Sequence, residues 1–351
     1  MRQNQVGLIE FLAATALACL VMLLIYPAEG MSAAIRGISI WWDILFPALF
    51  PFFVISEMLL GFGIVHFFGT IMDPIMRPFF RIPGIGGFVV AMGFASGYPV
   101  GARLTSQLWD QGLITRDEGE RLVAFTTTSD PIFLIGAVSV GFFHDVELAL
   151  ILALSHYGSA LCIGFLMRFH GKACPLEVIT VKEKNHSLLH RSFEAMHAAR
   201  LKDGRPLGLL LQQAILSSIP LIFVIGGLVV FFSVVIEFLT ISHILGILSR
   251  YLHVLLGYLH IPKALSPAFV NGYFEVTLGV KSAAQIGGNI PLIYKVAAAS
   301  FLLSWGGLSV HAQVVSLLHR TKMRYFPFLV ARSVHSVLAA VFVMLFWDTL
   351  Q

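Results

Sequence analysis

Long apolar runs recur along almost the whole chain, and they constrain its fold more than any other feature. A helix that crosses a hydrocarbon layer of about 30 Å needs roughly 20 apolar residues. Seven runs reach this length, at about 8–26, 46–68, 121–142, 148–168, 207–239, 290–318 and 327–347. Only 12% of the residues are charged, against roughly 25% in a typical soluble domain. The sequence therefore predicts an all-α integral membrane protein with about seven full spans in the lipid bilayer.

Charge and cysteine content narrow the classes of function. The net charge is +4, but the basic residues gather in a few loops, as topology determinants do, so we expect no nucleic-acid partner. Cys19, Cys162 and Cys174 have neither metal-site nor disulfide spacing. The sequence contains no P-loop, HExxH motif, dinucleotide fingerprint or nucleophile-and-base set. We therefore expect no metal, no cofactor and no enzymatic activity.

Two further apolar stretches, 85–108 and 264–288, are interrupted by glycine and proline. The basic loops Arg168–Arg205 and 319–326 should both be cytoplasmic, because positive residues favour that side. If 264–288 crossed the membrane, three crossings would separate these loops, so we expect it to enter and return on one side. The polar stripe of 241–260 indicates an interfacial helix; if that segment also crossed, the parity would be restored. This topology places the N-terminus inside and the C-terminus outside.

The interrupted stretches contain matching motifs, which indicate an internal repeat. The motif FASGYPVG around Gly97 has a partner, FVNGYFEV, around Gly272, and these glycines are 272 − 97 = 175 positions apart. The same offset takes Ser129, in TTTSDPIFLIG, to Ser304, in FLLSWGGLSV. Shared spacing between two pairs of broken segments favours a duplicated unit over a chance match.

The order of segments sets the expected domain boundaries. Each half reads as a span, an interfacial helix, a re-entrant broken segment, a broken span and a final span. The topology directs 46–68 inward and its partner 207–239 outward, so we expect inverted repeats, a signature of many secondary transporters. The expected parts are an N-terminal span at 1–30, a first repeat at 31–168, a cytoplasmic basic loop at 169–206 and a second repeat at 207–351.

The broken segments are the candidate binding site. Irregular backbone survives in a membrane only inside protein or around a wet cavity, and half-helix ends supply amide donors and carbonyl acceptors. We expect these segments to form two walls of one cavity for a small polar solute, with Tyr98 and Tyr273 stacking on it or hydrogen-bonding to it. Alternatively, glycine and tyrosine here only permit close helix packing. The candidate substrate-binding residues are Ser96, Gly97, Tyr98, Pro99, Thr127, Ser129, Asp130, Asn271, Gly272, Tyr273, Glu275, Ser304, Gly306, Gly307, His311 and Gln313.

Ionisable side chains at membrane depth are the sharpest candidates in this set. Glu275, in the second re-entrant segment, is expected to handle the solute, a proton or a cation, unless it pairs with Lys281 or Arg103. Asp130 either shares that role or caps a half-helix that begins at Pro131.

Two further polar residues inside spans have alternative interpretations. His311, with Gln313, either meets Glu275 in the cavity or makes a polar contact between helices. Glu57, in the middle of 46–68, is a weaker candidate that could bond to a neighbouring helix.

Three segments are similar to the YlbJ family of bacterial sporulation integral membrane proteins. They are SGYPVGARLTSQLWDQGLI…ERLVAFTTTSDPIFLIGAVSVG at 96–141, DGRPLG at 203–208 and FVNGYFEVTLGV…SFLLSWGGLSVHAQ at 269–313. Relatives of this family carry the paired Gate, or nucleoside-recognition, domain, which is related to concentrative nucleoside transporters. The resemblance covers roughly residues 40–347. It implies two Gate-like repeats with re-entrant hairpins and broken helices, a place in the bacterial cytoplasmic membrane and a role in forming the spore cortex.

These observations together predict a transporter or permease of a small polar solute that spore cortex formation requires, coupled to a proton or a cation. The alternative class is a non-transporting assembly protein that recruits sporulation proteins through the basic loop 169–206. A homo-oligomer is compatible with either class.

Overall fold

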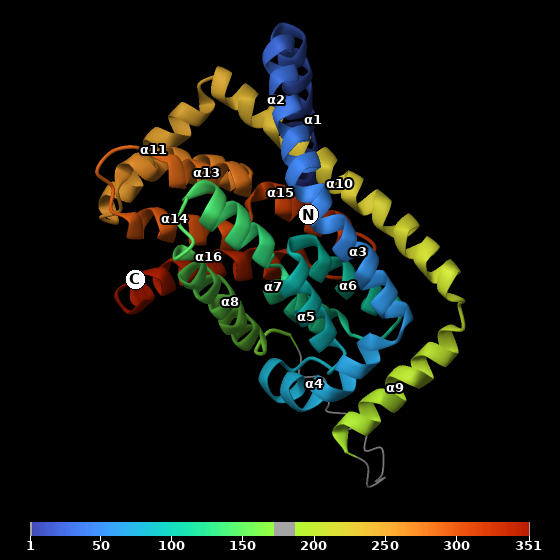
Figure 1. Ribbon diagram of the computed structural model, residues 1–351. Coiled ribbons are helices and arrows are strands. Elements are labelled where there is room, and N and C mark those ends of the chain that lie inside the picture. The colour runs from blue at the N-terminus through green and yellow to red at the C-terminus, as the bar shows by residue number, and fades with distance from the viewer. Residues whose placement is uncertain (1, 172–186, 351) are drawn as a thin grey trace.

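A computed structural model describes residues 2–171 and 187–350, which form helices and connecting loops without a strand (Figure 1). The chain opens with α1 (Arg2–Ile25), and α2 (Pro27–Ile40) follows it at a bend of 108°. The π-helical turn η1 (Trp41–Leu45) joins α2 to α3 (Phe46–Gly61) without an interruption. Gly63, with φ of +77°, then turns the chain into α4 (Ile64–Phe80) at a bend of 81°.

A hairpin, a broken helix and a long helix complete the first half. The hairpin consists of α5 (Gly86–Ser96) and α6 (Tyr98–Asp110). The broken helix begins as α7 (Arg116–Thr126), loses helical structure at 127–130 and resumes as the π-helical η2 (Ile132–Phe142). Its start is defined by a capping box, in which Thr115 and Glu118 satisfy each other's backbone amides. The last helix is α8 (Leu148–Met167).

The second half has the same order of elements. After α9 (Leu188–Asp203), it begins with α10 (Leu207–Ile241) and α11 (Ile244–Tyr258). The short turn η3 (Lys263–Leu265) leads to a hairpin of α12 (Ser266–Phe274) and α13 (Val276–Gln285). The broken helix consists of α14 (Leu292–Trp305) and α15 (Gly307–Leu318), and α16 (Tyr325–Leu350) ends the fold.

Fewer helices meet the length and hydropathy of a full span than the seven expected. Among the described residues, four do so: Leu148–Met167, Leu207–Ile241, Leu292–Leu318 and Tyr325–Leu350. Two bent pairs, Ala13–Ile25 with Pro27–Asp43 and Leu49–Gly61 with Ile64–Phe80, raise the number to six. The expected span 121–142 is divided between α7 and η2, and the first turns of α7 carry charge at Arg116, Asp117, Glu118 and Glu120. The protein is a multi-pass helical membrane protein.

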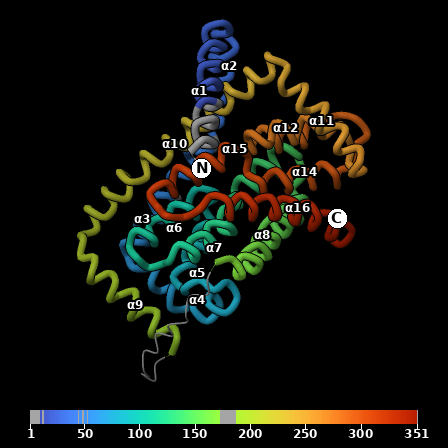
Figure 2. The backbone as a smooth tube through the Cα atoms, turned by 180° about the vertical axis from the view of Figure 1, so that it is seen from behind, coloured from blue at the N-terminus to red at the C-terminus, as the bar shows by residue number. Residues whose placement is uncertain are grey.

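Two long helical stretches, 27–61 and α10, cross each other beside the remaining helices (Figure 1). They approach closely because Gly37 faces α10 at the Val230 backbone and Gly226 lies under the ring of Trp41. The indole N–H of Trp41 also donates to Ile222 O at 3.0 Å. On the opposite side, α16 lies beside both α8 and α14 (Figure 2). Small residues allow such close crossings between membrane helices.

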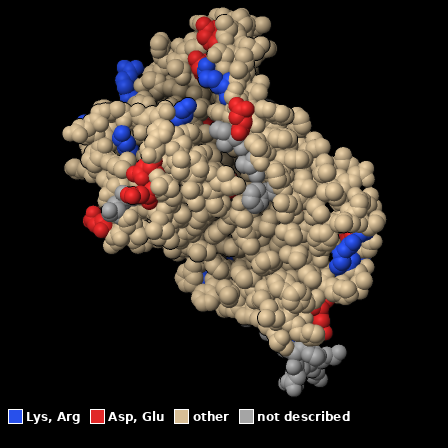
Figure 3. Space-filling model, in the orientation of Figure 1, with Lys and Arg blue, Asp and Glu red and all other residues tan. Residues whose placement is uncertain are grey.

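The surface agrees with a lipid environment. Figure 3 shows a face that is mostly free of charged side chains, with the charged groups gathered in its upper part and at its right margin. Large apolar side chains such as Leu24, Phe223 and Leu345 are more than half exposed on helices. Exposure of so many apolar side chains to water would be unfavourable. In a bilayer the lipid chains surround them.

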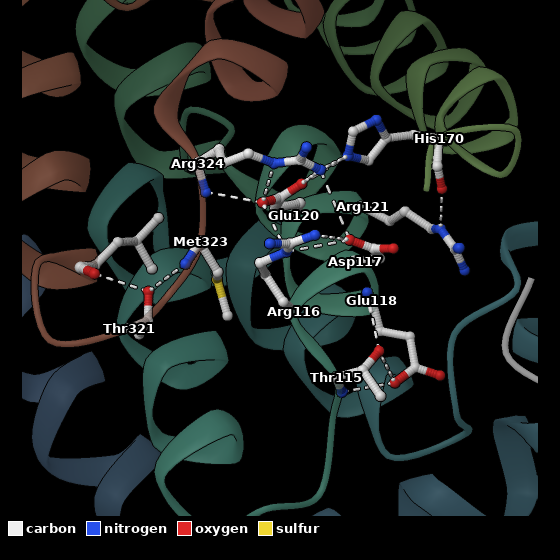
Figure 4. Close-up of polar contacts among 11 residues, drawn as sticks. Thr115, Arg116, Asp117, Glu118, Glu120, Arg121, His170, Thr321, Met323 and Arg324 are labelled. Atoms are coloured by element: carbon white, nitrogen blue, oxygen red, sulfur yellow. Dashed lines mark hydrogen bonds and ion pairs between the residues drawn. The ribbon is translucent and has the colours of Figure 1, made fainter. Parts of the chain in front are cut away.

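The described ends of the two basic loops meet at one end of the molecule, around Glu120 of α7 (Figure 4). His170 Nε2 lies 2.6 Å from Glu120 Oε2, and Arg324 Nη2 lies 2.8 Å from the same oxygen. The Glu120 side chain is only 1% exposed. The ends of the two loops at His170 and Arg324 therefore lie side by side; the part of the loop at 172–186 lies outside the described residues.

Candidate functional site

The first hairpin tip packs against the break of the first broken helix. Gly97 has φ of +88°, a conformation that glycine adopts without strain. A Cβ on Gly97 would lie 3.1 Å from Asp130 Oδ2, and a Cβ on Gly93 or Gly101 would lie 2.7 Å from Thr126 O. The glycines of FASGYPVG therefore let the hairpin close around the end of α7.

The second hairpin tip meets the second break in a similar way. Gly306, which follows α14, and Gly307, which begins α15, have φ of +85° and +72°. A Cβ on Gly307 would lie 3.0 Å from Phe274 O and 3.1 Å from Gly272 O, so only glycine fits here without movement. Each hairpin tip thus packs against the break of its own half.

The two tips do not correspond at the offset of 175 between the GY motifs. The first hairpin turns at Gly97, directly before Tyr98, whereas the second turns at Glu275, directly before Val276. Tyr98 and Val276 therefore take equivalent places, 276 − 98 = 178 positions apart. The sequence motif and the structural turn are displaced by about three residues.

Because of this displacement, Tyr273 does not face the same space as Tyr98. Its ring stacks on Trp305 with 5.7 Å between the ring centroids, and its side chain is 49% exposed. Both rings line an apolar groove of about 800 Å³ between α11, α12, α14 and α16. The expected pair of tyrosines around one solute is therefore not formed.

His156 of α8 bridges the two breaks. The backbone N–H of Ser129 donates to His156 Nε2 at 2.9 Å, and His156 Nδ1 lies 2.8 Å from Ser304 Oγ. Because Nε2 accepts a hydrogen bond, Nδ1 carries the proton and donates to Ser304. All three residues are fully buried. The two serines at equivalent places in the repeat are joined by this imidazole, which cannot act as a base toward Ser304 while it donates to it.

Arg332 of α16 lies between the C-terminal ends of α7 and α14. It donates from Nη1 to Thr127 O and from Nη2 to Leu303 O at 3.4 Å. Nη1 also donates to His335 Nδ1 at 2.9 Å, and His335 Nε2 donates in turn to His156 O at 3.0 Å. Arg332 and His335 are both fully buried. One network of hydrogen bonds therefore connects both breaks with α8 and α16.

Hydroxyl groups add further hydrogen bonds to carbonyl groups at these helix ends. Tyr98 donates to Leu303 O at 2.8 Å. Thr126 and Thr127 each donate at 2.8 Å to the carbonyl oxygen four residues earlier. Buried backbone groups without a partner would be costly, so this run of threonines lets α7 end inside the protein.

Asp130 and Glu275 both cap half-helices. Asp130 Oδ1 accepts from Phe133 N at 2.8 Å at the start of η2, and Glu275 Oε2 accepts from Leu278 N at 2.7 Å at the start of α13. The sequence suggested capping for Asp130 alone; for Glu275 that expectation was incomplete. The carboxylate charges oppose the positive N-terminal ends of the two half-helices.

Both acids also face one small cavity between the halves. It has a volume of about 50 Å³. Its lining from the hairpins and breaks includes five of the candidate residues, namely Tyr98, Pro99, Asp130, Glu275 and Gln313. Leu45, Leu49, Ile225 and Val229 of the two long helical stretches close its other side. A cavity of this size holds one or a few water molecules.

The remaining candidate residues do not line this cavity. Nine belong to the tips and breaks that shape it: Ser96, Gly97, Thr127, Ser129, Asn271, Gly272, Ser304, Gly306 and Gly307. His311 is turned away from Glu275, because Nε2 donates to Trp305 O at 3.2 Å and Nδ1 lies 2.7 Å from the Tyr325 hydroxyl. It makes the polar contact between helices that was the alternative interpretation.

Glu57 likewise has a partner on another helix. It lies 2.6 Å from Arg103 Nη2 and 2.7 Å from Gln107 Nε2 of α6. Arg103 is thereby occupied, and Glu275 pairs with neither Arg103 nor Lys281 among the described contacts. The pair holds the first hairpin to α3.

Three residues of the buried network, His156, Arg332 and His335, were missed in the sequence. The signal was present, because all three are ionisable and lie within the expected spans 148–168 and 327–347. Ionisable residues at that depth mark functional positions by default. The broken segments by themselves do not indicate that α8 and α16 supply the residues that connect them.

Two hairpins, two broken helices and the cavity between them define a class: a multi-pass membrane protein built around interrupted helices. Residues 43–167 match the Gate family, described as nucleoside recognition. The chain is 41% identical over 325 residues to the sporulation integral membrane protein YlbJ of Bacillus subtilis strain 168, covering 93% of this chain and 79% of that protein. An uncharacterized protein of Alkalihalophilus pseudofirmus is 26% identical over 99 residues, which is 27% of this chain and 21% of the relative. The chain belongs to the YlbJ family of sporulation integral membrane proteins.

Proposed function

We propose that this protein is a transporter or permease that moves a small polar solute across the cytoplasmic membrane during spore cortex formation. The observation that carries the proposal is the cavity that Asp130 and Glu275 face from opposite halves of the chain. Transporters with inverted repeats bind their solutes at such an interface, beside half-helix ends. The descriptions of the relatives, a sporulation membrane protein and a nucleoside-recognition domain, are compatible with this function.

The size of the cavity sets a condition on transport. A pocket for a drug-sized or nucleoside-sized ligand has roughly 300 to 1,000 Å³, whereas this cavity has about 50 Å³. The described conformation therefore represents an occluded state without room for such a solute. We infer that the hairpin tips and the long helical stretches separate to admit it.

The carboxylates of Asp130 and Glu275 are the proposed coupling groups for a proton or a cation. Both are buried, and both line the cavity while they cap their half-helices. Gln313, Ser309 and Thr277 add neutral hydrogen-bonding groups to the lining. This composition favours neutral or positively charged solutes over anions.

A screen followed by uptake measurements tests the function. Purified wild type and Glu275→Gln are tested by thermal shift against nucleosides, amino acids and dipicolinate, with Glu237→Gln as the matched control. Glu237 of α10 pairs with Arg36 of α2, and neither residue lines the cavity. A compound that stabilises wild type and the control, but not Glu275→Gln, is then followed into proteoliposomes. Normal uptake of that compound by Glu275→Gln, with normal spore cortex in cells, would sink the proposal.

The proposed topology consists of inverted repeats with the N-terminus inside and the C-terminus outside. It is supported by the meeting of 168–171 with 319–324 at one end of the molecule. In a chain with its three cysteines replaced by serine, Lys281→Cys should react with an impermeant thiol reagent outside the cell. Lys322→Cys should react only after the membrane is opened. Labelling of both from the same side would refute this topology.

The second candidate function is a non-transporting protein that recruits sporulation proteins. The observation in its favour is α9, which packs on α4 through Phe193 and Phe67 and presents the exposed side chains of Arg191 and Lys202. Replacing these two basic residues with glutamine separates the functions. A recruiter should lose spore maturation, whereas a transporter should keep solute uptake in proteoliposomes.

A further inference from the structure

The ends of the two broken helices present carbonyl groups inside the membrane. Thr127 is the C-cap of α7, and Leu303 is in the last turn of α14. The C-terminal end of a helix carries about −0.5 of an elementary charge, so the two ends together present roughly one negative charge. In transporters with discontinuous helices, such carbonyl groups coordinate the coupling cation.

Arg332 already occupies this place. Its Nη1 and Nη2 atoms donate to Thr127 O and Leu303 O, one carbonyl from each broken helix. It lies 332 − 325 = 7 residues into α16, roughly 10 Å along the helix from its start. Guanidinium stays charged in proteins, and no carboxylate of the described residues lies within ion-pair distance of Arg332.

The charge of Arg332 is opposite in sign and similar in size to the combined charge of the two helix ends. One guanidinium charge opposes about one negative charge from the two helix ends. The groups around it are neutral, since the His335 Nδ1 atom accepts from the guanidinium and Tyr98 shares the carbonyl of Leu303. A metal cation added at these carbonyls would meet a positive charge within hydrogen-bond distance of both.

We infer that Arg332 is a built-in substitute for a coupling metal cation, held at the carbonyl ends of the two broken helices. It acts as a positioning residue, because its hydrogen bonds to Thr127 O and Leu303 O hold the two breaks in place relative to each other. A sodium or potassium ion is therefore excluded from these two carbonyl groups. The inference rests on the proposed function, since it decides which ion can couple to transport.

The effect of cations on thermal stability tests the role of Arg332 without any solute. Its failure can therefore be distinguished from a failure of the proposed function, which uptake measurements test. Thermal unfolding of the full chain in nanodiscs is measured in sodium, potassium and N-methylglucamine chloride. A cation at 100-fold excess over its dissociation constant would raise the melting temperature by about 4 °C. Wild type should melt at the same temperature in all three salts. A rise of that size in sodium or potassium would overturn the inference.

Removing the positive charge of Arg332 should make the stability of the protein depend on an added cation. Arg332→Ser should melt at a lower temperature and regain several degrees on addition of millimolar guanidinium or of sodium. The control is Arg81→Ser, which removes an exposed arginine whose guanidinium donates to the backbone carbonyl of Arg168, and its melting temperature should not respond to these cations. A folded Arg332→Ser that responds to none of them would overturn the inference, as would an equal response in the control.

A second variant covers the case in which Arg332→Ser does not fold. Arg332→Lys keeps one positive charge on a long side chain beside the same carbonyl groups, although with a different shape. It should remain insensitive to sodium, in agreement with the inference. Sodium-dependent stability of Arg332→Lys would contradict it, because a retained charge should still exclude the metal ion.

Discussion

Replacement of His156 by leucine tests the bridge between the two breaks most directly. Leucine has a similar volume but no polar atoms, so the change removes the acceptor for Ser129 N–H and the donor to Ser304 Oγ. The bond from His335 Nε2 remains, because it reaches the backbone carbonyl of residue 156. The site is fully buried, so water does not replace the lost partners without a change in packing.

The expected loss follows from these contacts. A buried amide left without a partner costs about 1–3 kcal/mol, and the Ser304 hydroxyl, which can rotate, costs less. We expect a total loss of about 3 kcal/mol in the free energy of unfolding, which corresponds to a fall of roughly 4 °C in the melting temperature of a chain of this length. His156→Gln should lose about half as much, because its amide oxygen can accept from Ser129.

Thermal unfolding in nanodiscs, followed by tryptophan fluorescence, measures the effect. Trp305 is a local reporter, since it ends α14 next to the second break. His253→Leu is the matched control, because His253 is exposed on α11 and exposed substitutions usually change stability by less than about 0.5 kcal/mol. Unfolding of His156→Leu at the wild-type temperature would refute the bridging role. So would strict additivity of His156→Leu with Ser304→Ala, because residues in one hydrogen-bond network are expected to couple.

Three further perturbations address other contacts. Tyr98→Phe removes the hydroxyl that donates to a carbonyl at the end of α14, and it should lower the free energy of unfolding by about 1 kcal/mol in urea titrations. Glu120→Gln should cost about 2 kcal/mol in the same titrations, because Arg324 donates charge-assisted hydrogen bonds to this buried carboxylate; an unchanged midpoint would contradict the role of the cluster. The hydrogen bond from Arg205 holds the pKa of Asp203, the last residue of α9, below its ordinary value. The resulting stability is complete above the unfolded pKa of about 3.9 and is lost as the pH falls through the folded pKa, so Asp203→Asn should flatten the stability profile in that range.

Helix breaks could be predicted because they follow from local chemistry. Gly97 and Gly306 take positive φ values, and this freedom is a property of glycine itself. The spacing of the glycine motifs also indicates that the broken segments form two pairs. The order of elements in the two halves follows from the same pattern of apolar runs and interruptions.

The position of the second turn could not be read from the motif. The first hairpin turns at the glycine, but Gly272 remains helical and the turn lies at Glu275. Gly272 instead serves packing, because a Cβ on it would lie 2.5 Å from Leu302 Cδ2. The dipeptide GY thus forms a turn in the first hairpin and a packing contact in the second. The sequence motif alone does not distinguish these two roles.

The partners of the buried polar residues also depend on tertiary structure. His156 and Ser304 are 148 positions apart, and Arg332 and Thr127 are 205 apart. Depth in a membrane segment indicates that such a residue needs a partner. It does not indicate which of many carbonyl groups the residue will reach, because that depends on how α8 and α16 pack beside the breaks.

The distribution of charge around the breaks connects the network with the cavity. The two C-terminal helix ends are opposed by Arg332, and this part is close to neutral. At the cavity, the N-terminal ends of η2 and α13 together offer about one positive charge, whereas Asp130 and Glu275 supply two negative charges when both are ionised. An excess of about one negative charge therefore faces the cavity. Since Arg332 excludes a metal ion at the carbonyl ends, a proton shared by the two carboxylates, or a positive charge on the solute itself, is the simplest way to balance that excess.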